Sequence, residues 1–564
     1  MSSYRRVILR IICWALGSIA ALLFVLMTTI MVLHATTNLE EPDYEPVLGD
    51  AIQVSDSLRI WKDNALRLNP EGLWEMKISG SPLERGEAIG KLGGDLLYSQ
   101  EKAFVDKIFE MIPNRRYLGF LHYFITIFNH RLGKSVPLEY RQELKAMSAS
   151  CTHEFDEFGT PYERQMQYHA AHDIGHVMQD YMLVGCTSFA VWGKNSADSS
   201  LTIGRNFDFY MGEKFSQNKL VLFERPDSGY SYVSVTWPGM IGVLSGMNTA
   251  GLTVTINASK LETPSMSATP ISILTKRILQ YASDIDEAWR IAGDYKTFVS
   301  ESIMIGSAKD GRAAIIEKTP SRMAMYDPAC LDTSLTHIVC TNHYQSDLFR
   351  YEPVNQENIR MSDSNYRFLR VEELIDSLGK ISPESAAMIL RDTKGIGGES
   401  IGYCNELSVN QLLAMHSVIF QPEKLRIWVS TSPWQYGKFI CYELDKVMGA
   451  DFSCNVSSDS MSICEDSFIH SRTFADIMKF KQMQTMIDNA TKSHLSIPED
   501  SLSMFENLNP LCYNGYNIAG NYYDAIGKTD RAMELWTKSL EFKMKPQERK
   551  FIEDKILAVL KKKK

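Results

Sequence analysis

The chain has 564 residues, of which 45% are hydrophobic and 23% charged, and its formal net charge is −9. This composition is typical of globular proteins and excludes a disordered or collagen-like chain. No basic surplus is available to neutralise phosphates, so we expect no nucleic-acid partner. Ten cysteines without a CxxC motif argue against a disulfide scaffold or a zinc site, although a local Cys454–Cys464 bridge stays open.

Residues 1–34 have the pattern of a membrane anchor. The run 11–33 carries no charged side chain, and a helix of that length crosses a hydrocarbon core of about 30 Å. Arginines precede the run and acids follow it, which predicts a cytoplasmic N-terminus and a periplasmic or extracellular remainder. A cleaved signal peptide is the alternative, but its apolar region is shorter, at roughly 7–15 residues. Residues 35–48 are polar and predict a linker.

Residues 49–185 predict a helical lead-in, with helices over 83–112, 138–149 and 162–182. The last of these carries three histidines at offsets that share one helix face, namely His169, His172 and His176. A metal site is conceivable there. No fourth ligand is evident, so hydrogen-bonded or capping histidines are the favoured interpretation. We expect neither a metal nor a cofactor.

From residue 186 to 448 the pattern changes to alternation, which is typical of β-strands. Helical stretches interrupt the strands at about 270–295, 364–378 and 383–392. Because the strands do not alternate regularly with helices, we expect antiparallel sheets, stacked in two layers and covered by helices. The predicted strands are 186–193, 201–209, 219–224, 230–236, 241–247, 252–258, 301–307, 312–318, 337–342, 415–421 and 425–431.

The first two strands of this region bring a thiol close to two charged side chains. A turn between 186–193 and 201–209 places Cys186 near Arg205 and Asp208. A thiolate is a strong nucleophile, and an α-amine with a pKa of about 7.7–8.0 is matched to remove a thiol proton. We therefore interpret Cys186 as a nucleophile that becomes a new N-terminus when the chain is cut after Gly185. Glycine at that position adopts strained dihedrals easily and leaves its carbonyl accessible.

In this scheme Arg205 lowers the thiol pKa, and Asp208 orients the amine. The change from helical to alternating pattern falls at the same place, which makes Gly185 a plausible processing site. Each residue also has a plain structural interpretation: Cys186 as a small core residue, and Arg205 with Asp208 as an ordinary ion pair.

Five motifs follow one another along the chain: Gly185-Cys186, the Arg205 and Asp208 of GRNFDF, the NTAGL element at 248–252, Thr341-Asn342 and NYRF at 365–368. With them, residues 77–440 resemble the cysteine branch of the N-terminal nucleophile hydrolases. They are most similar to the penicillin acyl-CoA acyltransferase-like (acyl-coenzyme A:6-aminopenicillanic acid acyltransferase) family, which is related to the choloylglycine hydrolases. The resemblance implies an α/β (α+β) fold, a four-layer αββα sandwich.

The resemblance also implies six catalytic residues. Cys186, Arg205 and Asp208 match the nucleophile and its strand-borne partners. Asn257, after the NTAGL element, would donate to the oxyanion, and Asn342 would orient the substrate or support that site. Arg367 matches the late arginine of the family, with Arg370 as the alternative. The resemblance implies cleavage of a non-peptide C–N amide bond of an N-acyl compound through an acyl-thioester on Cys186, by hydrolysis or by acyl transfer, and leaves the acyl group and the amine open.

Residues 449–564 predict a helical appendage. Gly520, Tyr523, Gly527, Ala532 and Trp536 have the spacing of one tetratricopeptide-like helix pair, with a turn at 527–530. One repeat does not make an independent solenoid, so a cap docked on the core is the favoured interpretation. The alternative function for the whole chain is a surface-anchored scaffold with a degenerate hydrolase fold, which binds partners through these helices.

Overall fold

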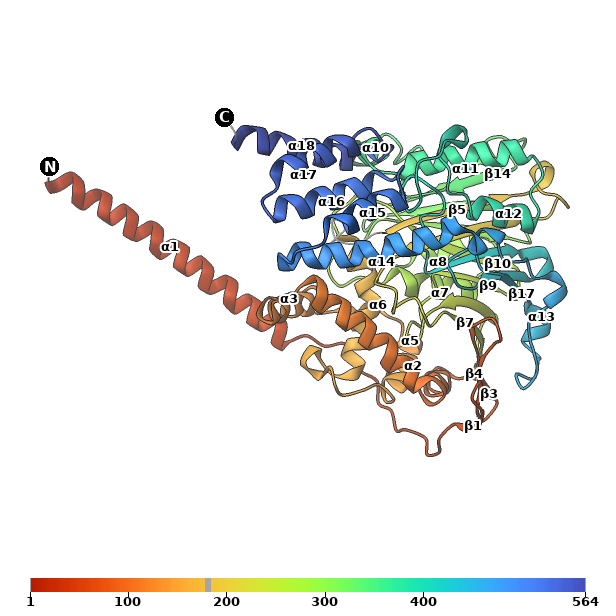
Figure 1. The fold of residues 1–564 in the computed structure, drawn as a ribbon. Coiled ribbons are helices and arrows are strands. Elements are labelled where there is room, and N and C mark those ends of the chain that lie inside the picture. The colour runs from red at the N-terminus through yellow and green to blue at the C-terminus, as the bar shows by residue number, and fades with distance from the viewer. Residues whose placement is uncertain (1, 178–183, 563–564) are drawn as a thin grey trace.

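Two stacked β-sheets form the centre of the molecule, and helices cover their outer faces (Figure 1). The computed structural model describes residues 2–177 and 184–562. Within these residues the smaller sheet has six strands in the order β14-β5-β6-β15-β16-β17. They are β5 (Val184–Val191), β6 (Thr202–Phe209), β14 (His337–Cys340), β15 (His416–Gln421), β16 (Arg426–Ser430) and β17 (Phe439–Glu443).

The larger sheet has eleven strands, in the order β1-β2-β3-β4-β7-β8-β9-β10-β11-β12-β13 within the same residues. They are β1 (Ile52–Ser55), β2 (Leu58–Trp61), β3 (Asn64–Leu68), β4 (Trp74–Gly80), β7 (Leu220–Pro226), β8 (Tyr232–Thr236), β9 (Ser245–Asn248), β10 (Leu252–Ala258), β11 (Glu301–Ser307), β12 (Arg312–Lys318) and β13 (Met323–Tyr326).

Helices from different parts of the chain cover each sheet. The outer face of the larger sheet carries α2 (Pro82–Met111), α7 (Ile271–Tyr281) and α8 (Ile285–Gly293), and that of the smaller carries α11 (Ser364–Leu378) and α12 (Pro383–Leu390). The other helices are α3 (Arg115–Phe128), α4 (Leu132–Ser135), α5 (Leu138–Ser148), α6 (Pro161–Val177), α9 (Pro328–Leu331), α10 (Pro353–Met361) and α13 (Leu444–Val447).

Burial of both sheet faces explains the sequence of the central strands. Ala190 and Ile203 of the smaller sheet pack against Phe223 and Val235 of the larger one in a single cluster. β10 and β11 are buried along their whole length, because one face meets the second sheet and the other meets helices. The antiparallel stacked sheets expected from the sequence are therefore confirmed for the central strands.

Two expectations about the sheets and the lead-in are wrong. The lead-in is not helical throughout, because β1–β4 occupy 52–80 before the first of its long helices. These strands are short, and their pairing is completed by β7, which lies far along the chain. That β4–β7 pair is also parallel, unlike its neighbours. A local pattern of four to seven residues carries too little alternation to show either feature.

Segments from both sides of position 185 are built into one core. In addition to the β4–β7 pair, four fully buried charged side chains meet between them: Arg85 and Glu143 from the lead-in, and Glu224 and Lys276 from later in the chain. Their N–O contacts lie between 2.6 and 3.3 Å. Buried charges are tolerated only when paired, so separating the two segments would be costly. We expect a chain cut after Gly185 to stay associated.

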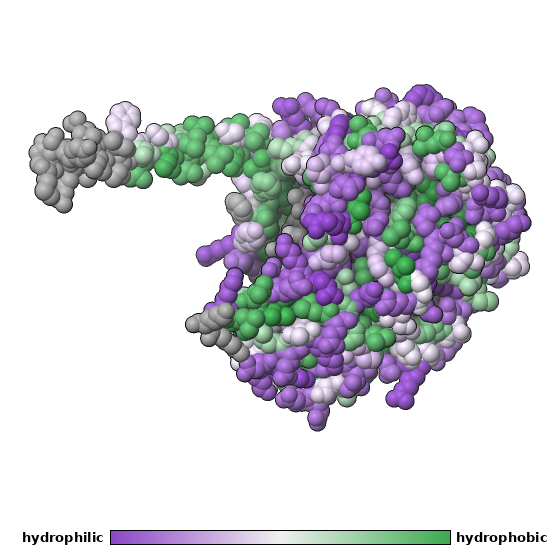
Figure 2. All heavy atoms as spheres, turned by 90° about the horizontal axis from the view of Figure 1, so that it is seen from above, coloured by the Kyte–Doolittle hydropathy of each residue, from purple (hydrophilic) through white to green (hydrophobic). Residues whose placement is uncertain are grey.

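The N-terminal helix α1 (Ser2–Ala35) projects away from the body, and apolar side chains cover much of its segment Cys13–Ala35 (Figure 2). Its segment Cys13–Ala35 is long and apolar enough to cross a membrane. At the base of α1, His34 stacks on Tyr123 of α3, with ring centroids 4.2 Å apart.

The C-terminal appendage, residues 472–562, has a hydrophobic core of its own. Its helices are α14 (Arg472–Ser493), α15 (Glu499–Leu508), α16 (Tyr513–Ala525), α17 (Thr529–Ser539) and α18 (Pro546–Lys562). α16 and α17 form a helix pair where one is predicted, and a Cβ on Gly520 would lie 2.6 Å from the Trp536 ring. The tetratricopeptide-like character of the pair stays a prediction. Gly527 has φ of +80° in the turn between them, where glycine is favoured.

Candidate active site

The paired strands β5 and β6 divide the predicted site between two faces. Cys186 lies opposite Phe207, and Gly185 lies opposite Asp208. Because side chains alternate along a strand, Cys186 and Arg205 face the second sheet, whereas Asp208 faces the helix layer. The strand that carries Cys186 and the strand that carries Arg205 and Asp208 are therefore paired, as the sequence predicts.

Arg205 lies against the thiol. Its Nη2 donates to Cys186 Sγ at 3.7 Å and also to the Ile256 carbonyl, and its Nη1 donates to the Leu244 carbonyl at 2.8 Å. Both side chains are buried. Burial raises the pKa of the Cys186 thiol, and the opposing effect of the Arg205 cation does not reverse this. The uncut chain therefore holds a protonated thiol, which needs a base before it can attack.

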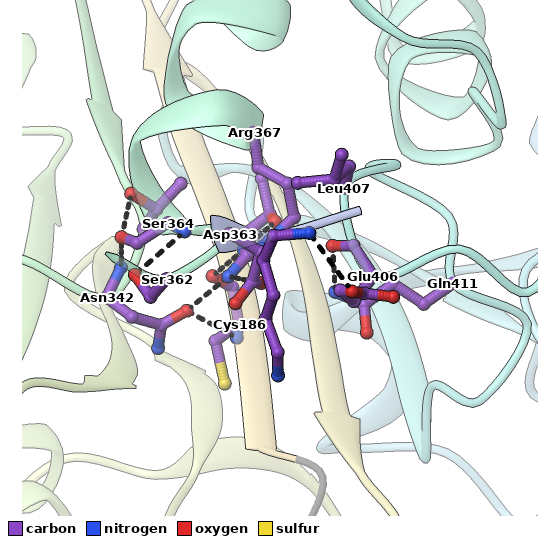
Figure 3. A network of polar contacts seen from close by, with 12 residues as sticks. Cys186, Asn342, Ser362, Asp363, Ser364, Arg367, Glu406, Leu407 and Gln411 are labelled. Atoms are coloured by element: carbon purple, nitrogen blue, oxygen red, sulfur yellow. Dashed lines mark hydrogen bonds and ion pairs between the residues drawn. The ribbon is translucent and has the colours of Figure 1, made fainter. Parts of the chain in front are cut away.

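Arg367 and Asn342 hold the main chain of Cys186 from the side of α11 (Figure 3). Arg367 Nη1 donates to the Cys186 carbonyl at 2.8 Å and to Thr187 Oγ1 at 2.7 Å. Asn342 Oδ1 accepts from Arg367 Nη2 at 2.6 Å and from the Cys186 amide at 3.2 Å. The alternative arginine, Arg370, instead pairs with Asp392 and Glu373.

Asp208 is fully buried on the next strand, and within the described residues neither of its carboxylate oxygens accepts a hydrogen bond. Burial raises its pKa to about 8, although Arg367 and Arg205 act in the opposite direction. A buried carboxyl in this state is suited to pair with a new cation. An α-ammonium formed on Cys186 would appear on the strand beside it.

The raised pKa of Asp208 predicts a specific dependence of stability on pH. Between its ordinary value of 3.8 and about 8, the folded chain keeps a proton that the unfolded chain releases. Stability is therefore lost as pH rises through this window. In the uncut Cys186→Ala background, Asp208→Asn should remove this loss, which amounts to about 5 kcal/mol of the free energy of unfolding between pH 4 and pH 8. Denaturant titrations of both variants at the two pH values, in detergent, would measure it. If the free energy of unfolding changed equally with pH in both variants, the raised pKa of Asp208 would be contradicted.

Asn257 lies near the nucleophile but does not point its amide at it. Its Oδ1 accepts from Ser188 Oγ at 2.8 Å, and its Nδ2 donates to the Cys340 carbonyl at 2.9 Å. In the uncut chain its N–H group is therefore engaged between the sheets. The oxyanion role expected from the family remains a prediction for the processed state.

Gly185 is extended within β5, so the expectation of strained dihedrals at this glycine is wrong. The close approach of other side chains explains why this position is a glycine. A Cβ at this position would lie 3.1 Å from Gln411 Nε2, 3.5 Å from Arg367 Nη2 and 3.7 Å from Asp363 Oδ2. The first distance leaves no comfortable room for a side chain.

Sequence reasoning missed three groups around this site. Asp363 accepts from Arg367 Nε at 2.8 Å, and the i, i+4 spacing of the two residues on one helix was a usable signal. Gln411 and the Ser245–His416 pair come from distant loops and strands. His416 Nε2 lies 2.8 Å from Ser245 Oγ, which accepts from Arg205 Nη1. No local pattern marks these three residues.

The histidine face of α6 gives no support to a metal site. His169 is buried, with Nδ1 bonded to the Gln165 carbonyl at 2.8 Å and Nε2 accepting from the Ile241 amide at 3.0 Å. Both ring nitrogens are thus used within the protein. The side chains of His172 and His176 lie outside the described residues. No group of three or more ligand-type side chains able to hold a metal occurs among those that are described.

An apolar cavity of about 230 Å³ opens between α2, α3 and α6. Leu118 of α3 and Trp237 line it, and Phe209 stacks on Trp237 with ring centroids 5.9 Å apart. Phe207, opposite Cys186, continues this aromatic row and belongs to the same core cluster as the thiol. The cavity therefore lies on the cysteine side of β5 and β6.

The family model for acyl-coenzyme A:6-aminopenicillanic acid acyl-transferase matches residues 194–432. The resemblance predicted from the sequence is confirmed. The match includes Arg205, Asp208, Asn257, Asn342 and Arg367 but begins after Cys186, and it leaves out the appendage. The catalytic roles of these residues remain predictions.

The other similar proteins give weaker evidence about this chain than the family model does. An uncharacterized protein of Archaeoglobus fulgidus is 25% identical over 409 residues, which are 65% of this chain and 65% of that protein. The match thus spans less than two thirds of that relative. A Caenorhabditis elegans ortholog of N-acylethanolamine-hydrolyzing acid amidase is 16% identical, with 42% of this chain and 93% of that chain covered and a TM-score of 0.31. A mutant of conjugated bile acid hydrolase from Clostridium perfringens is 15% identical, with 48% and 95% covered and a TM-score of 0.33. Scores this low carry no argument about this chain.

Proposed function

We propose that the protein is a membrane-anchored, self-processing cysteine amidase that cleaves N-acyl amides outside the cytoplasm. The observation that carries the proposal is the convergence on Cys186. Arg205 contacts its thiol, while Arg367 and Asn342 hold its main chain. The match to an acyl-transferase family supports acyl chemistry at this site. The apolar helix α1 supports anchoring, with the N-terminus in the cytoplasm by the arginines before it.

Self-processing would begin with attack of Cys186 Sγ on the Gly185 carbonyl carbon. A C–S bond forms, the C–N bond between the two residues breaks, and the nitrogen takes up a proton. Water then hydrolyses the thioester, which gives a carboxylate on Gly185 and restores the thiol. The new α-amine lies beside Asp208, whose buried carboxyl becomes its partner. The lead-in stays in place through the β4–β7 pair and the buried ion cluster.

Amide cleavage repeats these steps on a substrate. The α-amine removes the thiol proton, and the thiolate attacks the acyl carbonyl. The leaving amine takes the proton, and an acyl-thioester remains on Cys186. Water completes hydrolysis, whereas a second amine completes acyl transfer. The amide of Asn257 would stabilise the oxyanion after giving up its bond to the Cys340 carbonyl.

The apolar cavity supports a long, apolar acyl group. Leu118→Trp should fill part of it and raise KM for long-chain N-acyl amides by about tenfold, because each buried methylene contributes about 0.8 kcal/mol. Cleavage of an N-acetyl amide should change little. Phe124→Trp, on the exposed side of the same helix, is the matched control. Equal effects on long and short chains would contradict this use of the cavity.

Acyl-enzyme trapping tests the proposed activity directly. The purified protein, in detergent, would be incubated with a panel of N-acyl amides, quenched in acid and digested for mass spectrometry. We expect the acyl mass on the peptide that begins with Cys186, and release of the amine. Wild-type protein that forms no adduct and releases no amine from any member of the panel would instead favour the scaffold function.

A further inference from the structure

The loop of residues 401–412 connects the appendage to the junction at Gly185. It leaves the helix layer of the smaller sheet and ends shortly before β15. Figure 3 shows Glu406 and Gln411 of this loop beside Asp363 and Arg367, close to Cys186. One side of the loop thus faces the candidate active site, and the other faces α15–α18.

The appendage contacts this loop at several successive residues, through hydrogen bonds and close packing. Asn509 Oδ1 accepts from the Tyr403 amide at 3.2 Å, and Asn509 Nδ2 donates to the Tyr403 carbonyl at 2.8 Å. Glu406 Oε1 accepts from Tyr513 Oη at 2.8 Å. Gly402 has φ of +79°, and a Cβ there would lie 2.6 Å from the Cys512 amide nitrogen. Side-chain and main-chain hydrogen bonds therefore hold the loop on the appendage, and a glycine at position 402 permits their close approach.

The same loop reaches the scissile residue. Gln411 is buried, and its Nε2 donates to the Glu406 carbonyl at 3.1 Å. That Nε2 is also the nearest atom to the Cβ position of Gly185, at 3.1 Å. A continuous series of contacts therefore runs from Tyr513 through Glu406 and Gln411 to Gly185.

A charged residue of the appendage, Lys545, also lies near the acidic side chains beside Gly185. Burial alone would lower the pKa of Lys545, but the carboxylates of Asp363, Glu406 and Glu548 together outweigh it and raise this pKa. Asp363 is in turn the ion-pair partner of Arg367, at 2.7 Å from Nη2. The main-chain amide of Lys545 also donates to Glu406 Oε1 at 3.4 Å, so this residue of the appendage lies beside the junction acids.

We propose that the appendage is a positioning element for self-processing: through Tyr513, Glu406 and Gln411 it holds Gly185 against Cys186 and sets the rate of cleavage. This inference rests on the self-processing proposed above. Tyr513, Glu406 and Gln411 are positioning residues, because they act on the scissile residue or on one another and not on the reacting thiol. The family match, residues 194–432, does not include the appendage.

The test measures the cleavage rate of the full chain in a cell-free system with detergent, by pulse labelling and a timed chase. Tyr513→Phe removes one hydroxyl and should slow cleavage by about tenfold, the effect of losing a hydrogen bond to a charged group. Gln411→Ala should slow it by at least as much. The double variant Tyr513→Phe/Glu406→Gln should be no slower than its slower single parent, because the two changes break one contact.

Tyr522→Phe is the matched control. It removes a buried hydroxyl from the same helix, one that accepts from the Ile497 amide at 2.7 Å and does not touch the loop. In the uncut Cys186→Ala background both tyrosine variants should lower Tm to a similar extent, whereas only Tyr513→Phe should slow cleavage. Cleavage of Tyr513→Phe at the wild-type rate would overturn the role of the appendage and leave self-processing intact. A wild-type chain that is never cut would overturn both.

Discussion

Replacing Arg367 with alanine should lower kcat for amide hydrolysis by about 10²–10³-fold, the effect of losing one preorganised donor at a reacting centre. The guanidinium of Arg367 bonds to the Cys186 carbonyl, Thr187 and Asn342. Its removal takes away the side-chain donor that holds the main chain of the nucleophile. KM should change far less than kcat, because no contact of Arg367 reaches the apolar cavity. Steady-state kinetics on processed enzyme would measure both constants.

Arg370→Ala is the control for this prediction. Arg370 lies three residues further along α11, is also buried and also forms ion pairs, but with Asp392 and Glu373. We expect a loss of stability comparable with that of Arg367→Ala and a kcat within about threefold of wild type. Equal losses of kcat in the two variants would show that Arg367 acts through the stability of α11 alone.

Replacing Arg205 with leucine should raise the pKa of the Cys186 thiol further and lower kcat/KM by about 10²-fold at neutral pH. Burial already raises this pKa, and the Arg205 cation is the nearest group that acts against it. The acid limb of the pH–rate profile, which requires the thiolate, should move to higher pH. Arg205→Lys keeps the charge but not the several donor positions, and should be intermediate.

The rate of thiol alkylation by iodoacetamide, followed against pH, gives a second readout for Arg205→Leu. A shift of the alkylation curve to higher pH is expected, because the thiolate is the reactive species. A variant that loses activity with an unchanged alkylation curve would contradict the electrostatic role and leave Arg205 as a packing residue.

The central strands and the nucleophile could be predicted because their signals are local. β5 and β6 alternate clearly, and the turn between them fixes which residues adjoin. Asn342 and Arg367 required the family motif, since they lie more than 150 residues from the cysteine to which they bond. β1–β4 could not be predicted, because short strands at a sheet edge are stabilised by pairing with strands elsewhere in the chain and carry little signal of their own.

The positions of Gln411 and Asp208 show what tertiary structure adds. Gln411 sits in a loop without periodicity, and only the folded structure brings its amide beside Gly185. Asp208 was expected as an orienting group, but its burial without a hydrogen-bond partner among the described residues is a property of the packed helix layer. Sequence alone indicates which residue types are present, whereas their protonation depends on burial by distant elements.

The N-terminal helix α1 and the C-terminal appendage, both outside the matched family segment, have different relations to the site. α1 is connected to the body through α3, whose Leu118 lines the apolar cavity. The proposed acyl pocket therefore lies near the base of the anchor. The appendage meets the opposite, helix-covered face of β5, where Asp363 and Gln411 lie.

Intact mass measurement of the denatured wild-type protein, with sequencing of its N-termini, tests the central claim most directly. The account predicts two polypeptides, one ending at Gly185 and one beginning at Cys186, which separate only on denaturation. It also predicts a single uncut chain for Cys186→Ala. An uncut wild-type chain that still hydrolyses N-acyl amides, or a Cys186→Ala chain cut at the same bond, would contradict it.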